Sequence, residues 1–139
     1  MINKRIRIIF VAFMLIFLLA GCGNSEFEED YNTYKELYVS VVNEFTPKDS
    51  NFDLEKLKEK HILEKIDQMK IIVTKMSSNA SNKREKQMLS NVIKFNEGLE
   101  FFQYAAKNKE DLTEDERGKI TSELLSAERY RRNIEDKKY

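Results

Sequence analysis

Apolar residues recur at alternating intervals of four and three, and this spacing constrains the fold more than any other feature. Because an α-helix has 3.6 residues per turn, such residues share one helix face. Three series keep the spacing: Phe27, Tyr31, Tyr34, Tyr38, Val41 and Phe45; Met88, Val92, Phe95, Leu99, Phe102 and Ala106; Ile120, Leu124, Ala127, Arg131 and Ile134. A fourth is less regular: Leu54, Leu57, Ile62, Ile66, Met69, Ile72, Val73 and Met76. The sequence therefore predicts four amphipathic helices.

Polar residues and one proline predict where the first two helices begin and end. Ser25 and Glu28 have the spacing of a capping box at the start of the first helix. Pro47 ends that helix, because the residue before a proline is pushed out of helical geometry. The second helix begins near Asp53, and its apolar series shifts by about one position around His61. We expect a bend there or a broad buried face.

The last two helices have clear start signals. Short polar side chains in residues 77–82 predict a loop. Asn82 with Glu85, and Thr113 with Glu116, have the spacing of N-terminal caps. Extra apolar residues widen the stripe of the third helix, which we therefore expect to be the most enclosed.

Few helix-breaking residues interrupt these patterns. After residue 22 the only glycines are Gly23, Gly98 and Gly118, and the only proline is Pro47. Gly98 lies within the third helix, where it marks either a close helix crossing or a tolerated glycine. Short connections favour antiparallel neighbours. The predicted fold is all-α, a small antiparallel up-and-down bundle of four helices. The alternatives are three helices with a loosely docked first helix, or an intertwined dimer.

The N-terminal segment is typical of a secretory signal. Lys4, Arg5 and Arg7 precede 13 residues, 8–20, without a polar or charged side chain. As a helix these residues span about 20 Å, well short of the ~30 Å hydrocarbon core of a bilayer. A permanent transmembrane helix is therefore disfavoured.

The end of this segment, Leu19, Ala20, Gly21 and Cys22, resembles the lipobox of bacterial lipoproteins. The resemblance implies that a signal peptidase recognises Leu19, Ala20 and Gly21 and cuts before Cys22. It also implies that Cys22, the only cysteine, carries acyl chains such as palmitate and anchors the protein to the extracytoplasmic face of the cell membrane. The alternatives are an uncleaved anchor, ordinary cleavage with a free thiol, or a core cysteine.

We expect three parts: residues 1–21 as signal peptide, 22–25 as lipidated cysteine and short tether, and 26–139 as the helical domain. Loss of three basic residues with the signal leaves 21 basic against 24 acidic residues, a net charge of −3. With no dominant basic face in an exported chain, nucleic acid is not an expected partner.

A tether this short, about 10 Å, holds the domain against the bilayer. In an up-and-down bundle the C-terminus returns to the anchored end, so five basic residues become candidates for contact with the membrane surface. They are Arg129, Arg131, Arg132, Lys137 and Lys138. Alternatively, these charges complement the dipole of the last helix and pair with Glu28, Glu29 and Asp30.

The sequence offers no catalytic or metal-binding motif. His61 is the only histidine, and Lys58 stands where an ExxH metal pair needs glutamate. Glycine-rich phosphate loops and DxDxDG-type calcium loops are absent from the sequence. We therefore expect no catalytic residue, metal or cofactor, and no enzyme. Paired carboxylates acting on envelope polymers are the third-ranked hypothesis.

Tyr31, Tyr34 and Tyr38 are the candidates for binding a protein partner, because tyrosine combines apolar area with a polar tip. The alternative is that they pack in the core. The leading hypothesis is a membrane-anchored, non-catalytic binding protein, by analogy with small immunity and exclusion lipoproteins. The runner-up is a carrier that holds a small lipid or hydrophobic ligand between its helices. The partner and the oligomeric state stay open.

Overall fold

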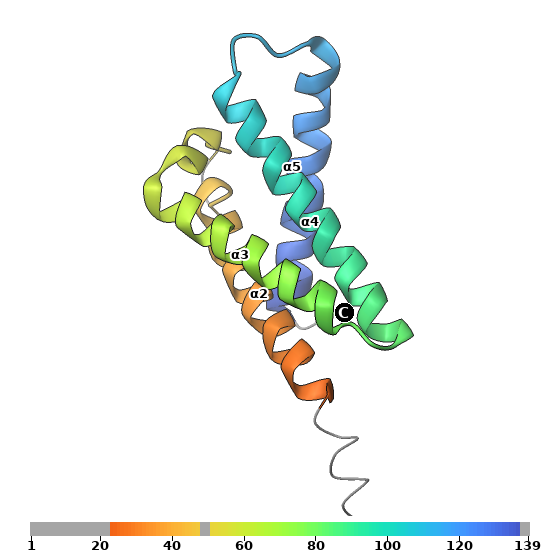
Figure 1. Cartoon of the computed structure of the whole chain (residues 1–139). Coiled ribbons are helices and arrows are strands. Elements are labelled where there is room, and N and C mark those ends of the chain that lie inside the picture. Colours follow the sequence, from red (N-terminus) through yellow and green to blue (C-terminus); the bar gives the residue numbers. More distant parts are fainter. Residues whose placement is uncertain (1–22, 48–50, 137–139) are drawn as a thin grey trace, which may run out of the picture.

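The computed structural model describes residues 23–47 and 51–136, and within them every regular element is a helix. The order is α2 (Gly23–Phe45), a short 3-10 helix η1 (Leu54–Lys58), α3 (Lys60–Asn79), α4 (Lys83–Lys107) and α5 (Glu114–Glu135). Consecutive long helices run in opposite directions (Figure 1). The predicted four-helix up-and-down bundle is confirmed. The predictions for residues 1–22, with Leu19, Ala20, Gly21 and Cys22, and for Lys137 and Lys138 lie outside the described residues.

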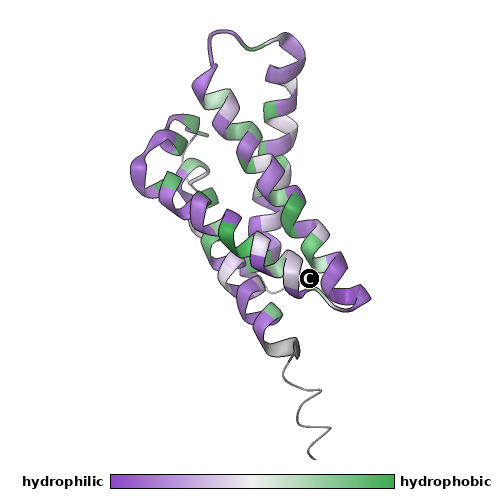
Figure 2. Ribbon diagram, viewed as in Figure 1, coloured by the Kyte–Doolittle hydropathy of each residue, from purple (hydrophilic) through white to green (hydrophobic). Residues whose placement is uncertain are grey.

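Helix α2 supplies a large share of the core. Six of its side chains are at most 2 % exposed: Phe27, Tyr34, Tyr38, Val41, Val42 and Phe45. Phe45 packs on Phe102 of α4, with ring centroids 5.3 Å apart. The alternative of a loosely docked first helix is therefore wrong. Among the described side chains, helix α2 has seven buried residues against six in the longer α4, where Ile93 is exposed, so the expectation that α4 is the most enclosed helix is wrong. Figure 2 shows hydrophilic and hydrophobic residues alternating along the helices, and a mostly hydrophilic α4–α5 connection.

Two predicted helix starts are confirmed as capping boxes. The Asn82 side chain accepts from the Glu85 amide at 3.0 Å, and the Thr113 hydroxyl accepts from the Glu116 amide at 3.3 Å. In return, each glutamate accepts from the backbone amide of its cap residue. At the starts of α4 and α5, side chains therefore accept hydrogen bonds from backbone amides that have no partner within the helix.

The predicted bend near His61 is confirmed as a break at Glu59, where φ is −69° and ψ is 136°. Asp53 caps η1 on one side of this break, and α3 begins at Lys60 on the other. An extended residue therefore separates the 3-10 helix η1 from the long helix α3.

Three boundaries differ from the prediction. The second helix is predicted to begin near Asp53, but residues 54–58 form the separate 3-10 helix η1 and α3 begins at Lys60. Helix α2 begins at Gly23, so the predicted tether is already helical from that residue and Ser25 is not the helix start. Helix α3 continues to Asn79, three residues into the predicted loop. The Ser77 and Ser78 hydroxyls donate to the carbonyls of Val73 and Thr74, four residues earlier, and so do not compete with the helix.

None of the helices in the described part of the chain is long and apolar enough to span a bilayer.

Candidate functional site

The tyrosines proposed as a binding stripe lie mainly in the core. Tyr34 and Tyr38 are 0 % and 2 % exposed, so the partner-binding prediction is wrong for both. The Tyr34 hydroxyl donates to the carbonyl oxygen of Val92 at 3.2 Å. Desolvation raises the pKa of both phenols far above the usual range, with a smaller contribution from neighbouring negative charge. Tyr31 is half-buried, and the Lys35 ammonium lies 4.8 Å from its ring centroid.

The basic residues of α5 do not form one exposed surface. Arg131 is 2 % exposed, and its guanidinium donates to Glu128 and Glu135 at 2.6–2.8 Å. It is therefore not accessible to a membrane, and the prediction for Arg131 is wrong. The two carboxylates compensate the buried charge of Arg131. Arg129 and Arg132 are exposed, and Arg132 pairs with Glu128 at 2.6 Å.

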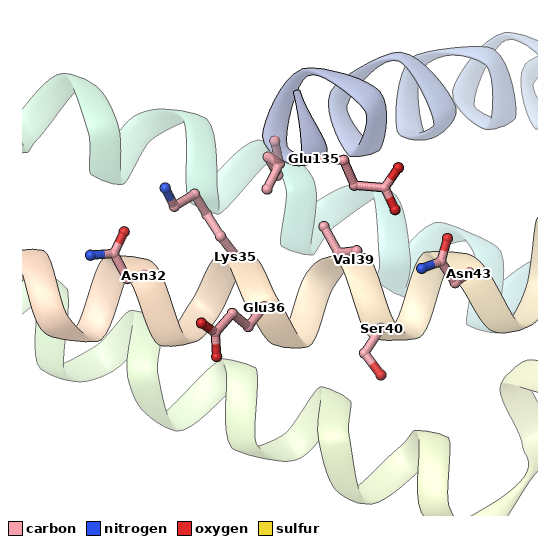
Figure 3. A pocket seen from close by; sticks show the side chains of 8 residues that line it. Asn32, Lys35, Glu36, Val39, Ser40, Asn43 and Glu135 are labelled. Carbon is pink, nitrogen blue, oxygen red and sulfur yellow. The ribbon is translucent and has the colours of Figure 1, made fainter. Parts of the chain in front are cut away.

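Helix α5 also ends away from the start of α2. Its last residues, Ile134 and Glu135, line the same pocket as Lys35 and Val39 in the middle of α2, and Figure 3 shows Glu135 beside this part of α2. Lys35 is twelve residues, about 18 Å of helix, from Gly23. Glu28 pairs instead with Arg84 of α4, at 3.3 Å.

A groove of about 680 Å³ runs along α2 where α5 stops. Its floor is the α2 face opposite the core, and the end of α5 forms one side. Figure 3 shows Lys35 and Val39 towards α5, and Glu36 and Ser40 towards α3. The lining residues are Asn32, Lys35, Glu36, Val39, Ser40, Asn43, Ile134 and Glu135. We call this the α2 groove.

Six of the eight residues that line the α2 groove have polar side chains. Asn32, Glu36 and Asn43 are exposed, and they offer two amides and one carboxylate along about 16 Å of one helix face. Hydrogen bonds hold two of the lining side chains: Lys65 of α3 donates to Ser40 at 2.7 Å, and Arg131 donates to Glu135 at 2.6 Å. An open groove with polar side chains along it suits a contact with a macromolecular surface better than the enclosure of a small apolar ligand.

The spacing of the α2 groove was present in the sequence. Asn32, Glu36, Val39 and Asn43 recur at intervals of four, three and four on the face opposite the apolar stripe. A polar face of this kind is the ordinary solvated side of an amphipathic helix. Only the position of α5 turns it into a groove, and no sequence signal gives that position.

The other hollows described are smaller than the α2 groove, and within the described part of the chain the histidine belongs to no metal-binding cluster. The hollow between α4, α5 and Tyr38 measures about 20 Å³, close to the space of one water molecule. His61 is exposed, 3.5 Å from Glu59 and 3.9 Å from Glu44. Across residues 23–47 and 51–136, no group of three or more His, Cys, Asp or Glu side chains is arranged to hold a metal ion.

Comparisons of the chain with family models, with curated proteins and with solved structures find no match.

Proposed function

We propose that this chain is a lipid-anchored, non-catalytic binding protein on the outer face of the cytoplasmic membrane, and that a protein partner docks in the α2 groove. The anchor rests on the lipobox-like residues that end at Cys22. The single observation that supports the binding role is the α2 groove, built on the helix that directly follows the anchor. An immunity or exclusion role at the membrane is the biological setting that suits such an arrangement.

The chemistry of the α2 groove supports a polar interface. Exposed amides at Asn32 and Asn43 both donate and accept hydrogen bonds, while the Glu36 carboxylate only accepts. Val39 and Ile134 provide a small apolar centre. A complementary partner surface presents a basic side chain opposite Glu36 and polar groups on either side of an apolar contact.

The binding role is tested by site-specific photo-crosslinking in intact cells. A photoreactive residue replaces Asn43 in the α2 groove or, as a control, Glu110 in the α4–α5 connection; both side chains are exposed. We expect one discrete adduct from position 43 and none from position 110. Glu36→Lys reduces the adduct because it reverses the charge beside the contact.

Two results would contradict this role: equal adducts from both positions, or an adduct from position 43 that survives Glu36→Lys unchanged. Lipidation is tested independently by mass spectrometry of the protein purified from cell membranes. The expected product begins at Cys22 and carries acyl chains.

A further inference from the structure

The start of α2 fixes which end of the bundle lies nearest to a lipid on Cys22. Helix α2 begins at Gly23, the residue bonded directly to Cys22. One residue extends at most about 3.6 Å, so an acyl anchor on Cys22 holds the first turn of α2 at the headgroup region. The elements beside this first turn are therefore close to the same surface.

The α3–α4 turn, residues 80–82, shares this end with the start of α2. Arg84, in the first turn of α4, lies 3.3 Å from Glu28, measured between Nη1 and Oε1. Figure 1 shows the turn at the same end of the molecule as the first residues of α2, whereas the α4–α5 connection lies at the opposite end. The antiparallel order of α2 and α3 favours this placement, and the contact between Arg84 and Glu28 establishes it.

Three exposed cations follow the α3–α4 turn: Lys83, Arg84 and Lys86. The Arg84 side chain is 76 % exposed, so its pairing with Glu28 leaves most of it in solvent. Glu85 is the acid between them, and it is 3 % exposed. Its Oε2 accepts from the Ser81 amide and hydroxyl at 2.7 and 2.8 Å and from the Asn82 amide at 3.3 Å.

Because Glu85 is buried, its negative charge is kept apart from the exposed positive charges of the first turn of α4. The Glu85 carboxylate is engaged by the backbone of the turn, so the three exposed ionic side chains of residues 83–86 are all positive. The first turns of α2 carry the opposite charge, with Glu26, Glu28 and Glu29 exposed. The anchored end of the bundle thus has a basic side on α4 and an acidic side on α2.

We infer that the basic side, Lys83, Arg84 and Lys86, contacts anionic lipid headgroups, and that the acidic side of α2 turns away from them. This inference rests on the proposed lipid anchor. An anchored domain meets the headgroups at a high local concentration, so a few cations are enough to select one orientation. This contact differs from the one predicted for Arg131, which is buried.

The test uses the mature protein extracted from cell membranes and reconstituted into vesicles of phosphatidylcholine, alone or mixed with phosphatidylglycerol. An amine-reactive reagent labels exposed lysines, and mass spectrometry gives the rate at each site. We expect Lys83 and Lys86 to react about fivefold more slowly on the anionic vesicles. Lys107 and Lys109, at the opposite end, react equally on both, and high salt removes the difference.

A matched pair of variants tests whether the charge causes this protection. Arg84→Gln weakens the slowing at Lys83 and Lys86, whereas Lys109→Gln leaves it unchanged. Equal labelling of Lys83 on both kinds of vesicle, or slowing at Lys109 instead, overturns the inference. Mass spectrometry of the same sample separates the two proposals: an unmodified Cys22 contradicts the anchor, while an acylated Cys22 with equal labelling contradicts only the orientation.

Discussion

The packing of the bundle does not require a glycine at position 98. A Cβ atom built at this position meets only Glu123 Oε2 within 4 Å, at 3.7 Å, so the hypothesis of a close helix crossing is wrong. The residue is a tolerated glycine inside α4, where glycine costs about 1 kcal/mol relative to alanine.

Gly98→Ala is therefore expected to raise the free energy of unfolding by about 0.5 to 1 kcal/mol, measured by urea denaturation. Gly118→Ala in α5 is the matched control, because a Cβ there meets nothing within 4 Å. The two gains should be similar. A loss at Gly98 beside a gain at Gly118 would show that the α4–α5 contact needs the glycine after all.

The buried phenols give a second prediction at the residue scale. Burial raises the pKa of Tyr34 and Tyr38, so folding keeps both neutral where exposed tyrosines ionise. Their contribution to stability is complete below the usual tyrosine pKa of about 10 and is lost as the pH rises further. An alkaline titration followed by ultraviolet absorbance should show a late step that coincides with loss of helical circular dichroism. A Tyr34→Phe, Tyr38→Phe double variant should shrink that step, and gradual ionisation without a late step would contradict the expectation.

At the scale of the helices, the N-terminal cap of α4 is expected to contribute measurably to the free energy of unfolding. Asn82 accepts from the Glu85 amide, so Asn82→Ala should lower the free energy of unfolding by about 1 kcal/mol. Asn91→Ala is the control within the same helix, since Asn91 is exposed and alanine favours the helix interior. Thermal unfolding followed by circular dichroism should show opposite shifts for the two variants. Equal effects of the two substitutions would mean that the cap contributes nothing measurable.

The helices themselves could be predicted from the sequence because their signals are local. Apolar spacing, the caps at Asn82 and Thr113, and the break near His61 all act within a few residues. The site could not be predicted, because it depends on what covers each face. Periodicity identifies Tyr34 and Tyr38 as one side of a helix, but only the position of α4 decides that this side is core. In the same way, the groove exists because α5 ends beside Val39.

At the scale of the whole molecule, helix order determines what lies near the anchor. An even number of alternating helices suggested that the C-terminus returns to the start of α2. The helices differ in where they cross, however, and α5 ends beside Lys35 while the α3–α4 turn reaches Glu28. The direction of each helix follows from the short connections, but its offset along its neighbour depends on side-chain packing, which a repeating pattern does not encode.

The pH dependence of stability is also a property of the whole bundle. In the fold, hydrogen bonds to lysine, serine, threonine or arginine groups lower the pKa of five carboxyl groups: Glu55, Glu59, Glu85, Glu116 and Glu128. A carboxyl with a lowered folded-state pKa stabilises the fold above its unfolded pKa of about 4.3, and this stabilisation is lost as the pH falls through the folded value. Urea denaturation should therefore give a constant midpoint near neutral pH and a falling one at pH values below about 4. Glu85→Gln and Glu116→Gln together should flatten this fall, because two of the five groups no longer titrate. A urea midpoint that rises on acidification would contradict this prediction, because relief of repulsion among other acidic groups would then outweigh the loss of these hydrogen bonds.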